Sequence, residues 1–249
     1  MNYGICNLSI VPLRAEASDT SEMVSQVLYG EHFKILEIQK KWSNIRLSFD
    51  NYEGWVDNNQ YIEISENKYG QIDSLEKQYS AELVDYITIS DNTLLSICLG
   101  SHIHSASILN HHFEGSTISK VRSKEKIIDT ALLFLNSPYQ WGGKTPFGID
   151  CSGFSQMVYK LNGYKLLRDS SQQATQGESL SFIDESEPGD LAFFDNEEGV
   201  ITHVGIIMEN HHIIHAHGKV RIDRLDQTGI FNYHAKKHTH KLRVIKRII

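Results

Sequence analysis

The pattern of apolar and polar positions changes near residue 120 of this 249-residue chain. Before that point, short runs rich in β-branched and aromatic residues are separated by Gly, Asn and Asp, which is typical of β-strands joined by tight turns. Four such runs follow one another with no helical pattern between them, at residues 23–30, 33–38, 42–47 and 53–56. Strands spaced this closely predict a small β-barrel over residues 1–65.

The apolar runs of residues 66–120 also predict strands. The runs lie at residues 86–90 and 94–99 and continue into residues 100–103. No residue type or spacing in this segment points to chemistry. We therefore expect a β-rich connection that serves packing.

From residue 121 onward the apolar residues first follow a helical period. Residues 124–136 carry apolar side chains at helical spacing, and residues 151–162 do so again. Asp150 is a typical N-cap for the second helix, and Gly163 is a typical stop. Strand-like runs follow at residues 190–194, 203–208, 212–216, 220–224 and 242–245. Two helices followed by an antiparallel meander predict an α+β domain over residues 121–249, with the helices packed on the sheet.

The composition fits a globular protein and excludes several functions. Hydrophobic residues make up 40% of the chain, too many for a disordered protein. Lys and Arg number 24 against 31 Asp and Glu, a formal charge of −7 with no basic block, so no nucleic acid is expected as a partner. No apolar run approaches the ~20 residues that span a bilayer, so no membrane association is expected.

The cysteines and the first residues bear on the cellular compartment. Cys6, Cys98 and Cys151 are too scattered for a disulfide framework. The sequence after Met1 lacks the charged and apolar stretches of a signal peptide. Unless a leader has been removed, we expect a cytoplasmic protein with free thiols.

Cys151 is the strongest candidate for chemistry. It falls in the first turn of the predicted helix, where unpaired N–H groups and the helix dipole stabilise an anion. Such a position can lower a thiol pKa from ~8.5 to ~3.5–7.5 and supply a thiolate at neutral pH. A buried structural cysteine is the alternative, and it is the interpretation we adopt for Cys6 and Cys98, which lie in strand-like runs.

Two histidines could serve such a thiol. A thiolate nucleophile needs a base, and the base needs a group that orients it. His203 and His215 lie on consecutive predicted strands, and a hairpin centred near residues 208–211 would bring them nearly opposite each other. One imidazole could then hold the other, although a single histidine on a strand is more often structural.

Two further patterns suggest a metal or phosphate site, and both fail. The 13 histidines include close pairs such as His238-Thr-His240, but no Cys-x-x-Cys or His-Glu-x-x-His accompanies them. Gly143-Lys-Thr145 is similar to the end of a phosphate-binding loop, yet Pro138 stands where that loop needs glycine. We expect neither a metal nor a cofactor.

The region around Cys151 resembles the nucleophile region of the NlpC/p60 cysteine peptidases, and the match covers about residues 120–248. The ordered motifs are Pro138-Tyr-Gln-Trp-Gly-Gly143, Gly148-Ile-Asp-Cys-Ser-Gly-Phe154, Leu167-Arg-Asp-Ser-Ser-Gln-Gln173, Pro188-Gly-Asp-Leu-Ala-Phe-Phe194, Thr202-His-Val-Gly205 and Ile214-His-Ala-His-Gly218. The resemblance implies a papain-like fold in which Cys151 is the nucleophile, His203 the base and His215 the residue that orients the base.

The first 65 residues resemble a bacterial SH3-like domain, and residues 66–120 could form a reduced second unit of this kind. The resemblance rests on Leu28-Tyr-Gly30, Ile35-Leu-Glu37, Lys41-Trp-Ser-Asn-Ile-Arg46 and Gly54-Trp-Val56. The domain order is similar to that of γ-D-glutamyl-L-diamino acid endopeptidases of murein recycling. It implies a substrate such as L-Ala-γ-D-Glu-diaminopimelate, or its Lys counterpart, with a free N-terminal alanine. The substrate-binding residues implied are Tyr52, Tyr139, Asp150, Ser152 and Ser170.

We therefore expect a cytoplasmic cysteine peptidase that hydrolyses the γ-D-Glu–L-diamino acid bond of murein peptides. Tyr52 and Asp150 are expected to close one end of the cleft around the free ammonium. Two departures from the family pattern are the extra His217 and the length of residues 66–120. The alternatives are a thiol acyltransferase or amidase on the same fold, and an inactive wall-binding protein, against which the intact set of Cys151, His203 and His215 weighs.

Overall fold

The computed structural model describes residues 2–233 and 235–249, which form two compact units. Unit 1 contains the described residues up to Lys120 together with Trp141–Pro146, and unit 2 contains Val121–Gln140 and Phe147–Ile249. Each unit has its own hydrophobic core. No helix in the described part of the chain is both long enough and apolar enough to cross a membrane.

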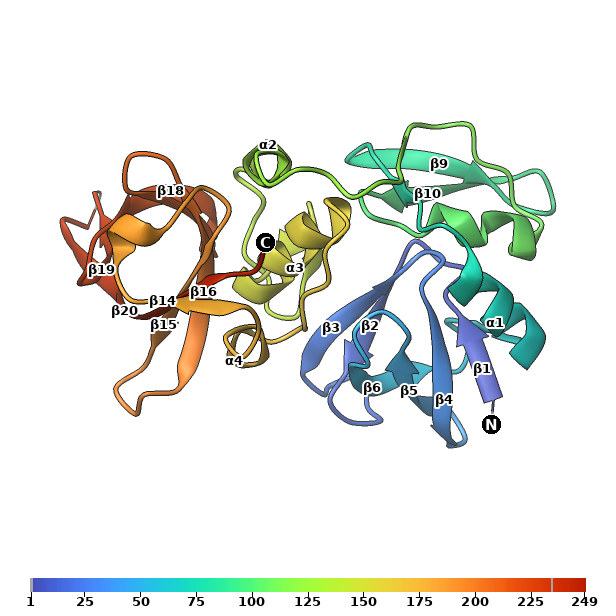
Figure 1. The fold of residues 1–249 in the computed structure, drawn as a ribbon. Coiled ribbons are helices and arrows are strands. Elements are labelled where there is room, and N and C mark those ends of the chain that lie inside the picture. The colour runs from blue at the N-terminus through green and yellow to red at the C-terminus, as the bar shows by residue number, and fades with distance from the viewer. Residues whose placement is uncertain (1, 234) are drawn as a thin grey trace. The chain divides into compact units, whose positions relative to one another are not determined.

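Unit 1 is built on an antiparallel sheet with the strand order β3-β2-β6-β5-β4-β1-β7 (Figure 1). The strands are β1 (Asn2–Ile5), β2 (Ile10–Arg14), β3 (Met23–Leu28), β4 (His32–Ile38), β5 (Trp42–Leu47), β6 (Glu53–Asp57) and β7 (Ile62–Ile64). Because successive side chains of a strand point to opposite faces, alternate residues such as Val11, Leu13 and Ile45 enter one core. The four strands predicted between residues 23 and 56 are confirmed.

Residues 66–120 contain two helical elements where the sequence predicted only strands. The helix α1 (Glu66–Ser74) is capped by the Ser65 side chain, and only Ile72 of its residues is buried, so it carries no apolar stripe. The segment predicted as a strand at residues 100–103 leads instead into the 3-10 helix η1 (Ile103–Leu109). Its buried apolar residues recur every third position, which suits three residues per turn rather than a strand.

The other elements of this region are short strands. They are β8 (Tyr79–Ser80), β9 (Val84–Thr88), β10 (Leu94–Cys98) and β11 (Thr117–Ile118). Residues 66–120 share a second core of unit 1 with Ile5 and Tyr29, so this segment does pack against the first strands.

The segment Trp141–Pro146, which includes β12 (Lys144–Thr145), lies within unit 1 although the sequence assigned it to residues 121–249. The reason is an ion pair between Lys144 and Glu31, which are 1% and 2% exposed. Lys144 Nζ lies 3.2 and 3.3 Å from the two carboxylate oxygens, and the Lys144 N–H donates to Gln26 Oε1 at 2.7 Å. The stretch that is similar to a phosphate loop is therefore packed into unit 1 by its lysine.

Unit 2 contains an antiparallel sheet that closes on itself. Its order is β14-β20-β15-β16-β17-β18-β19, and β19 pairs with β20 as well, so the strands from β15 to β20 form a ring (Figure 1). The strands of this sheet are β14 (Glu178–Leu180), β15 (Leu191–Asp195), β16 (Ile201–Met208), β17 (His212–His217), β18 (Lys219–Leu225), β19 (Gly229–Asn232) and β20 (Lys237–Arg247). The short strand β13 (Gly148–Ile149) lies outside this sheet. The five strands predicted here are confirmed, but their closure into a ring was not anticipated.

The helices of unit 2 are α2 (Lys126–Leu132), α3 (Cys151–Leu161), α4 (Ser170–Gln173) and the 3-10 turn η2 (Ile183–Glu185). All residues of α3 are buried, and α3 contacts β16 and β17. Asp150 caps α3 by accepting from the Gly153 N–H at 2.7 Å, and Gly163 follows the helix end with a φ of +88°. Both the extent of α3 and its cap agree with the sequence prediction.

The helix α2 is shorter than the predicted residues 124–136. The N–H groups of Leu133, Phe134 and Leu135 bond to carbonyls three residues earlier rather than four. This tighter 3-10 pattern ends the α-helix at Leu132, although the apolar spacing continues beyond it.

Candidate active site

Cys151 is the first residue of α3, and its sulfur lies beside β16. The Sγ atom is 4.0 Å from the carbonyl oxygen of Thr202, and the N–H of Val204 also interacts with it. The sulfur therefore lies next to the residues on both sides of His203. All three cysteines of the chain are free and buried, but Cys6 and Cys98 lie in unit 1.

His203 and His215 are brought together by the hairpin of β16 and β17. The register places Gly205 opposite His215, so His203, two residues from Gly205, shares its face of the sheet with His215. The Nε2 atom of His203 is 2.8 Å from the Nδ1 atom of His215, and both rings are buried. The hairpin predicted from the sequence is confirmed.

The hydrogen-bond chain continues to Asp223, a residue that the sequence analysis did not single out. Its Oδ2 atom lies 3.2 Å from His215 Nε2 and 2.7 Å from Arg221 Nε. Burial alone would raise the pKa of Asp223, but the hydrogen bonds from His215 and Arg221 outweigh it and lower the pKa. The sequence does contain a pattern that could have indicated Asp223: Arg221 and Asp223 alternate along the predicted strand that follows the strand of His215.

This chain of contacts assigns the protons on the two rings. An ionised Asp223 only accepts hydrogen bonds, so His215 Nε2 is the donor and His215 Nδ1 is an acceptor. His203 Nε2 must then donate to His215, which leaves the lone pair of His203 on Nδ1. The orienting partner of His203 is thus itself oriented by a charged group.

Burial disfavours a charge on the Cys151 thiol and on the His203 imidazole. Burial raises the pKa of the Cys151 thiol to about 12, and the neighbouring Asp150 adds to the rise. Burial also lowers the pKa of His203 well below its ordinary value of 6.5, with His215 contributing. The lowered thiol pKa expected at a helix start is not found, because desolvation outweighs the effect of the helix terminus.

Two further histidines, His217 and His240, lie near His203. His240, on β20, stacks on His203 with ring centroids 4.2 Å apart and an angle of 26° between the planes. His217 lies 4.8 Å from His240 and 6.5 Å from His203, measured between centroids. Within residues 2–233 and 235–249, no group of three or more His, Cys, Asp or Glu side chains is arranged to hold a metal ion.

Asp150 and Ser152 flank Cys151, and both bind a buried arginine. Arg168, 1% exposed, donates to Asp150 Oδ1 at 3.0 Å and to Oδ2 at 2.6 Å, and also to Ser152 Oγ at 2.9 Å. The sequence analysis did not assign Arg168 a role. Any substrate ammonium at Asp150 would therefore share this carboxylate with Arg168.

The remaining predicted substrate residues lie on separate elements. Ser170 begins α4, and Gln173 ties that helix to the start of α3 by donating to the Ser152 carbonyl at 2.9 Å. Tyr139 is partly buried, and burial followed by the nearby Cys151 raises its pKa to about 12. Tyr52 belongs to unit 1, where it packs against the core that contains Phe33 and Ile45.

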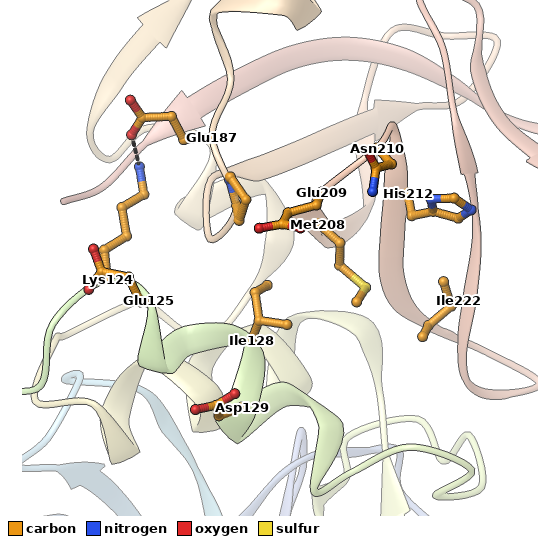
Figure 2. A pocket seen from close by; sticks show the side chains of 11 residues that line it. Lys124, Glu125, Ile128, Asp129, Glu187, Met208, Glu209, Asn210, His212 and Ile222 are labelled. Carbon is orange, nitrogen blue, oxygen red and sulfur yellow. Dashed lines mark hydrogen bonds and ion pairs between the residues drawn. The ribbon is translucent and has the colours of Figure 1, made fainter.

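A pocket of about 770 Å³ in unit 2 lies away from these residues. Figure 2 shows it between α2 and the turn from β16 to β17, with Ile128 and Met208 inside and several carboxylates around them. Lys124 at its edge is already paired with Glu187 at 2.9 Å. None of the predicted site residues lines this pocket.

Comparison with known proteins agrees with both parts of the fold. Residues 136–243 match the NlpC/P60 family, and residues 13–60 match the bacterial dipeptidyl-peptidase SH3 domain. An NlpC/P60 family protein from Bacillus cereus has a similar fold, with a TM-score of 0.77 at 17% identity, over 99% of each chain. The NlpC/P60 fold and the N-terminal SH3-like β-barrel predicted from the sequence are confirmed.

Two curated relatives extend over most of the chain. The γ-D-glutamyl-L-lysine dipeptidyl-peptidase of Bacillus subtilis is 30% identical over 77% of this chain and 71% of the relative. Dipeptidyl-peptidase 6 of Lysinibacillus sphaericus is 26% identical over 86% of this chain and 89% of the relative. The fold and these matches define a cysteine peptidase. The chain belongs to the NlpC/P60 family and carries an SH3-like domain before its catalytic domain.

Proposed function

We propose that this peptidase hydrolyses the γ-D-Glu–L-diamino acid bond of murein peptides, with Cys151 as nucleophile, His203 as base and His215 as the residue that orients the base. The observation that carries the proposal is the buried hydrogen-bond chain from His203 through His215 to Asp223, which begins beside the Cys151 sulfur. We infer that the helix α3 and its sheet serve as the two halves of a papain-like site.

The proposed reaction starts from the uncharged thiol and imidazole. As Sγ attacks the γ-carbonyl carbon, the thiol proton moves to Nδ1 of His203, whose other nitrogen is held by His215. His203 then gives this proton to the leaving amine, and a thioester remains on Cys151. A water then loses its proton to His203 and attacks the thioester carbonyl, the C–S bond breaks, and His203 returns the proton to Sγ of Cys151. The N–H at the start of α3 stabilises the oxyanion of each tetrahedral intermediate.

The negative charge of Asp223 supports this cycle. Each time His203 takes up a proton, an imidazolium forms in a buried place, where an isolated charge is costly. The His215 ring transmits the attraction of Asp223 to it through two hydrogen bonds. Asp223 is thus proposed to stabilise the charged intermediate without changing its own protonation state, while Arg221 keeps the Asp223 carboxylate ionised.

The proposed substrate is a short peptide with a free N-terminal alanine, followed by γ-linked D-Glu and then Lys or diaminopimelate. The activity for which the Bacillus subtilis relative is named supports the γ-D-glutamyl-L-lysine bond. Tyr52, Tyr139, Asp150, Ser152 and Ser170 are proposed to contact this peptide. Such a preference suits a cytoplasmic enzyme that recycles peptides released from the wall.

The test is mass spectrometry of defined peptides incubated with the full chain. L-Ala-γ-D-Glu-L-Lys and its diaminopimelate counterpart are expected to yield L-Ala-D-Glu and the free diamino acid. The matched control peptide carries an α-linked D-Glu and should remain intact, and Cys151→Ala should cleave nothing. Transfer of the L-Ala-D-Glu group to an added amine instead of water would favour an acyltransferase. Absence of any product with the wild-type chain would refute the proposal.

A further inference from the structure

The stacked ring of His240 has no part in the reaction described so far. Four histidine rings lie around the proposed site, and His203 and His240 form the closest pair. Their ring centroids are 4.2 Å apart, and the angle between their planes is 26°. His240 lies on β20, opposite Ile230 of β19. Its Nδ1 atom is 2.9 Å from the Thr239 hydroxyl. The ring is therefore fixed by its own strand.

A single hydrogen bond does not fix the plane of an imidazole. The bond from His203 Nε2 to His215 Nδ1 sets the position of one nitrogen, but small joint changes of χ1 and χ2 can still tilt the ring plane. A flat ring stacked on one face limits this tilting. The planes of His203 and His215 meet at 85°, so His215 contacts its partner edge to face and cannot supply such a surface.

We propose that His240 is a positioning residue, whose flat ring holds the plane of His203 so that its Nδ1 atom stays aimed at the Cys151 thiol. The proposal rests on the function proposed above for His203. It adds a residue that touches neither the thiol nor the substrate and acts only through the base.

The surroundings of His240 favour an uncharged ring. His203 faces it from β16, His215 and His217 from β17, Asp223 from β18 and Phe194 from β15. Burial, followed by the two histidines of β17, lowers the pKa of His240 to about 4, and Asp223 opposes this only in part. A neutral ring does not repel the imidazolium that His203 becomes, and its π face attracts that cation.

Two substitutions of His240 distinguish the effect of its flat ring from the effect of simply filling the same space. His240→Phe keeps an aromatic face of similar size, whereas His240→Leu fills the space without one. We expect His240→Leu to lower kcat by tenfold to about a hundredfold with KM within about twofold, since small misplacements of reacting groups have effects of this size. His240→Phe should stay within about threefold of wild type. His238→Leu, on the same strand, is the matched control and should leave both constants unchanged.

A second measurement does not depend on peptide hydrolysis. The rate of Cys151 alkylation by iodoacetamide reports the pairing of thiol and imidazole directly, and it should fall about tenfold in His240→Leu but not in His240→Phe. If the wild-type chain cleaves no peptide, the function proposed above fails while this rate still decides the role of His240. Equal alkylation rates in wild type and His240→Leu, or an equal loss in both variants, would overturn the proposal.

Discussion

Replacing Lys144 with Met should destabilise unit 1 strongly. Lys144 and Glu31 are almost fully buried, and without the lysine the carboxylate would keep weaker partners such as His102, at 3.6 Å, and the Leu28 N–H. Breaking a buried ion pair by removing one partner costs about 3–5 kcal/mol, because an uncompensated charge remains in a medium of low polarity. With a urea dependence of roughly 2 kcal/mol per molar, the midpoint of unfolding should fall by about 1.5–2.5 M.

The three tryptophans make this measurement specific for one unit. Trp42, Trp55 and Trp141 all belong to unit 1, so tryptophan fluorescence of the full chain in urea follows that unit alone. The matched control is Arg46→Met, which removes an ion pair to Glu53 whose two side chains are 42% and 47% exposed. An exposed pair contributes only about 0–1 kcal/mol.

The double variant completes the test. Lys144→Met combined with Glu31→Gln removes both charges, so it should be more stable than Lys144→Met alone. A Lys144→Met midpoint as close to wild type as that of Arg46→Met would refute the reasoning, since it would mean that the buried carboxylate does not need the lysine.

The remaining predictions concern the proposed chemistry. Cys151→Ala should abolish hydrolysis, while Cys98→Ala, a variant of a buried thiol of unit 1, should retain it; residual turnover by Cys151→Ala would exclude this nucleophile. His203→Ala should lower kcat more than His215→Ala, and Asp223→Asn should lower it less than either. The reason is that His215 acts on the base directly, whereas Asp223 acts on it only through His215. A histidine with the ordinary pKa of about 6.5 is only about one quarter neutral at pH 6.0. Because the pKa of His203 is lowered, kcat/KM at pH 6.0 should exceed half its value at pH 7.5, and a midpoint at pH 6.5 would contradict this. N-acetylation of the substrate alanine should reduce kcat/KM by at least about 30-fold if a desolvated charge pair worth ~2 kcal/mol is lost, whereas equal rates would show an open site.

Local patterns in the sequence predicted most strands and the start of the helix that bears Cys151. These features depend on periodicity and on capping residues such as Asp150, which lie next to the structure they determine. The helix α1 was missed because only Ile72 of its residues is buried, so its formation rests on the Ser65 cap and on packing with distant residues.

The parts of the site that the sequence did not predict are those that depend on long-range pairing. His215 was found because one hairpin relates it to His203. Finding Asp223 requires the register of the next hairpin, and finding His240 requires the closure of β20 onto both β15 and β19. The pKa of Cys151 was misjudged because burial by other elements cannot be read from the residues around it.

The closing strand β20 has a consequence for the order in which this protein matures on the ribosome. Until β20 has emerged, β15 and β19 both have an unpaired edge, and such edges are prone to pair with other chains. Cys151, His203 and His215 are all synthesised before that strand, yet the ring around the histidines is incomplete without it. A nascent chain would thus hold the nucleophile and base early but gain an ordered site only once β20 has paired, so we expect hydrolytic activity to be withheld until that strand has been synthesised.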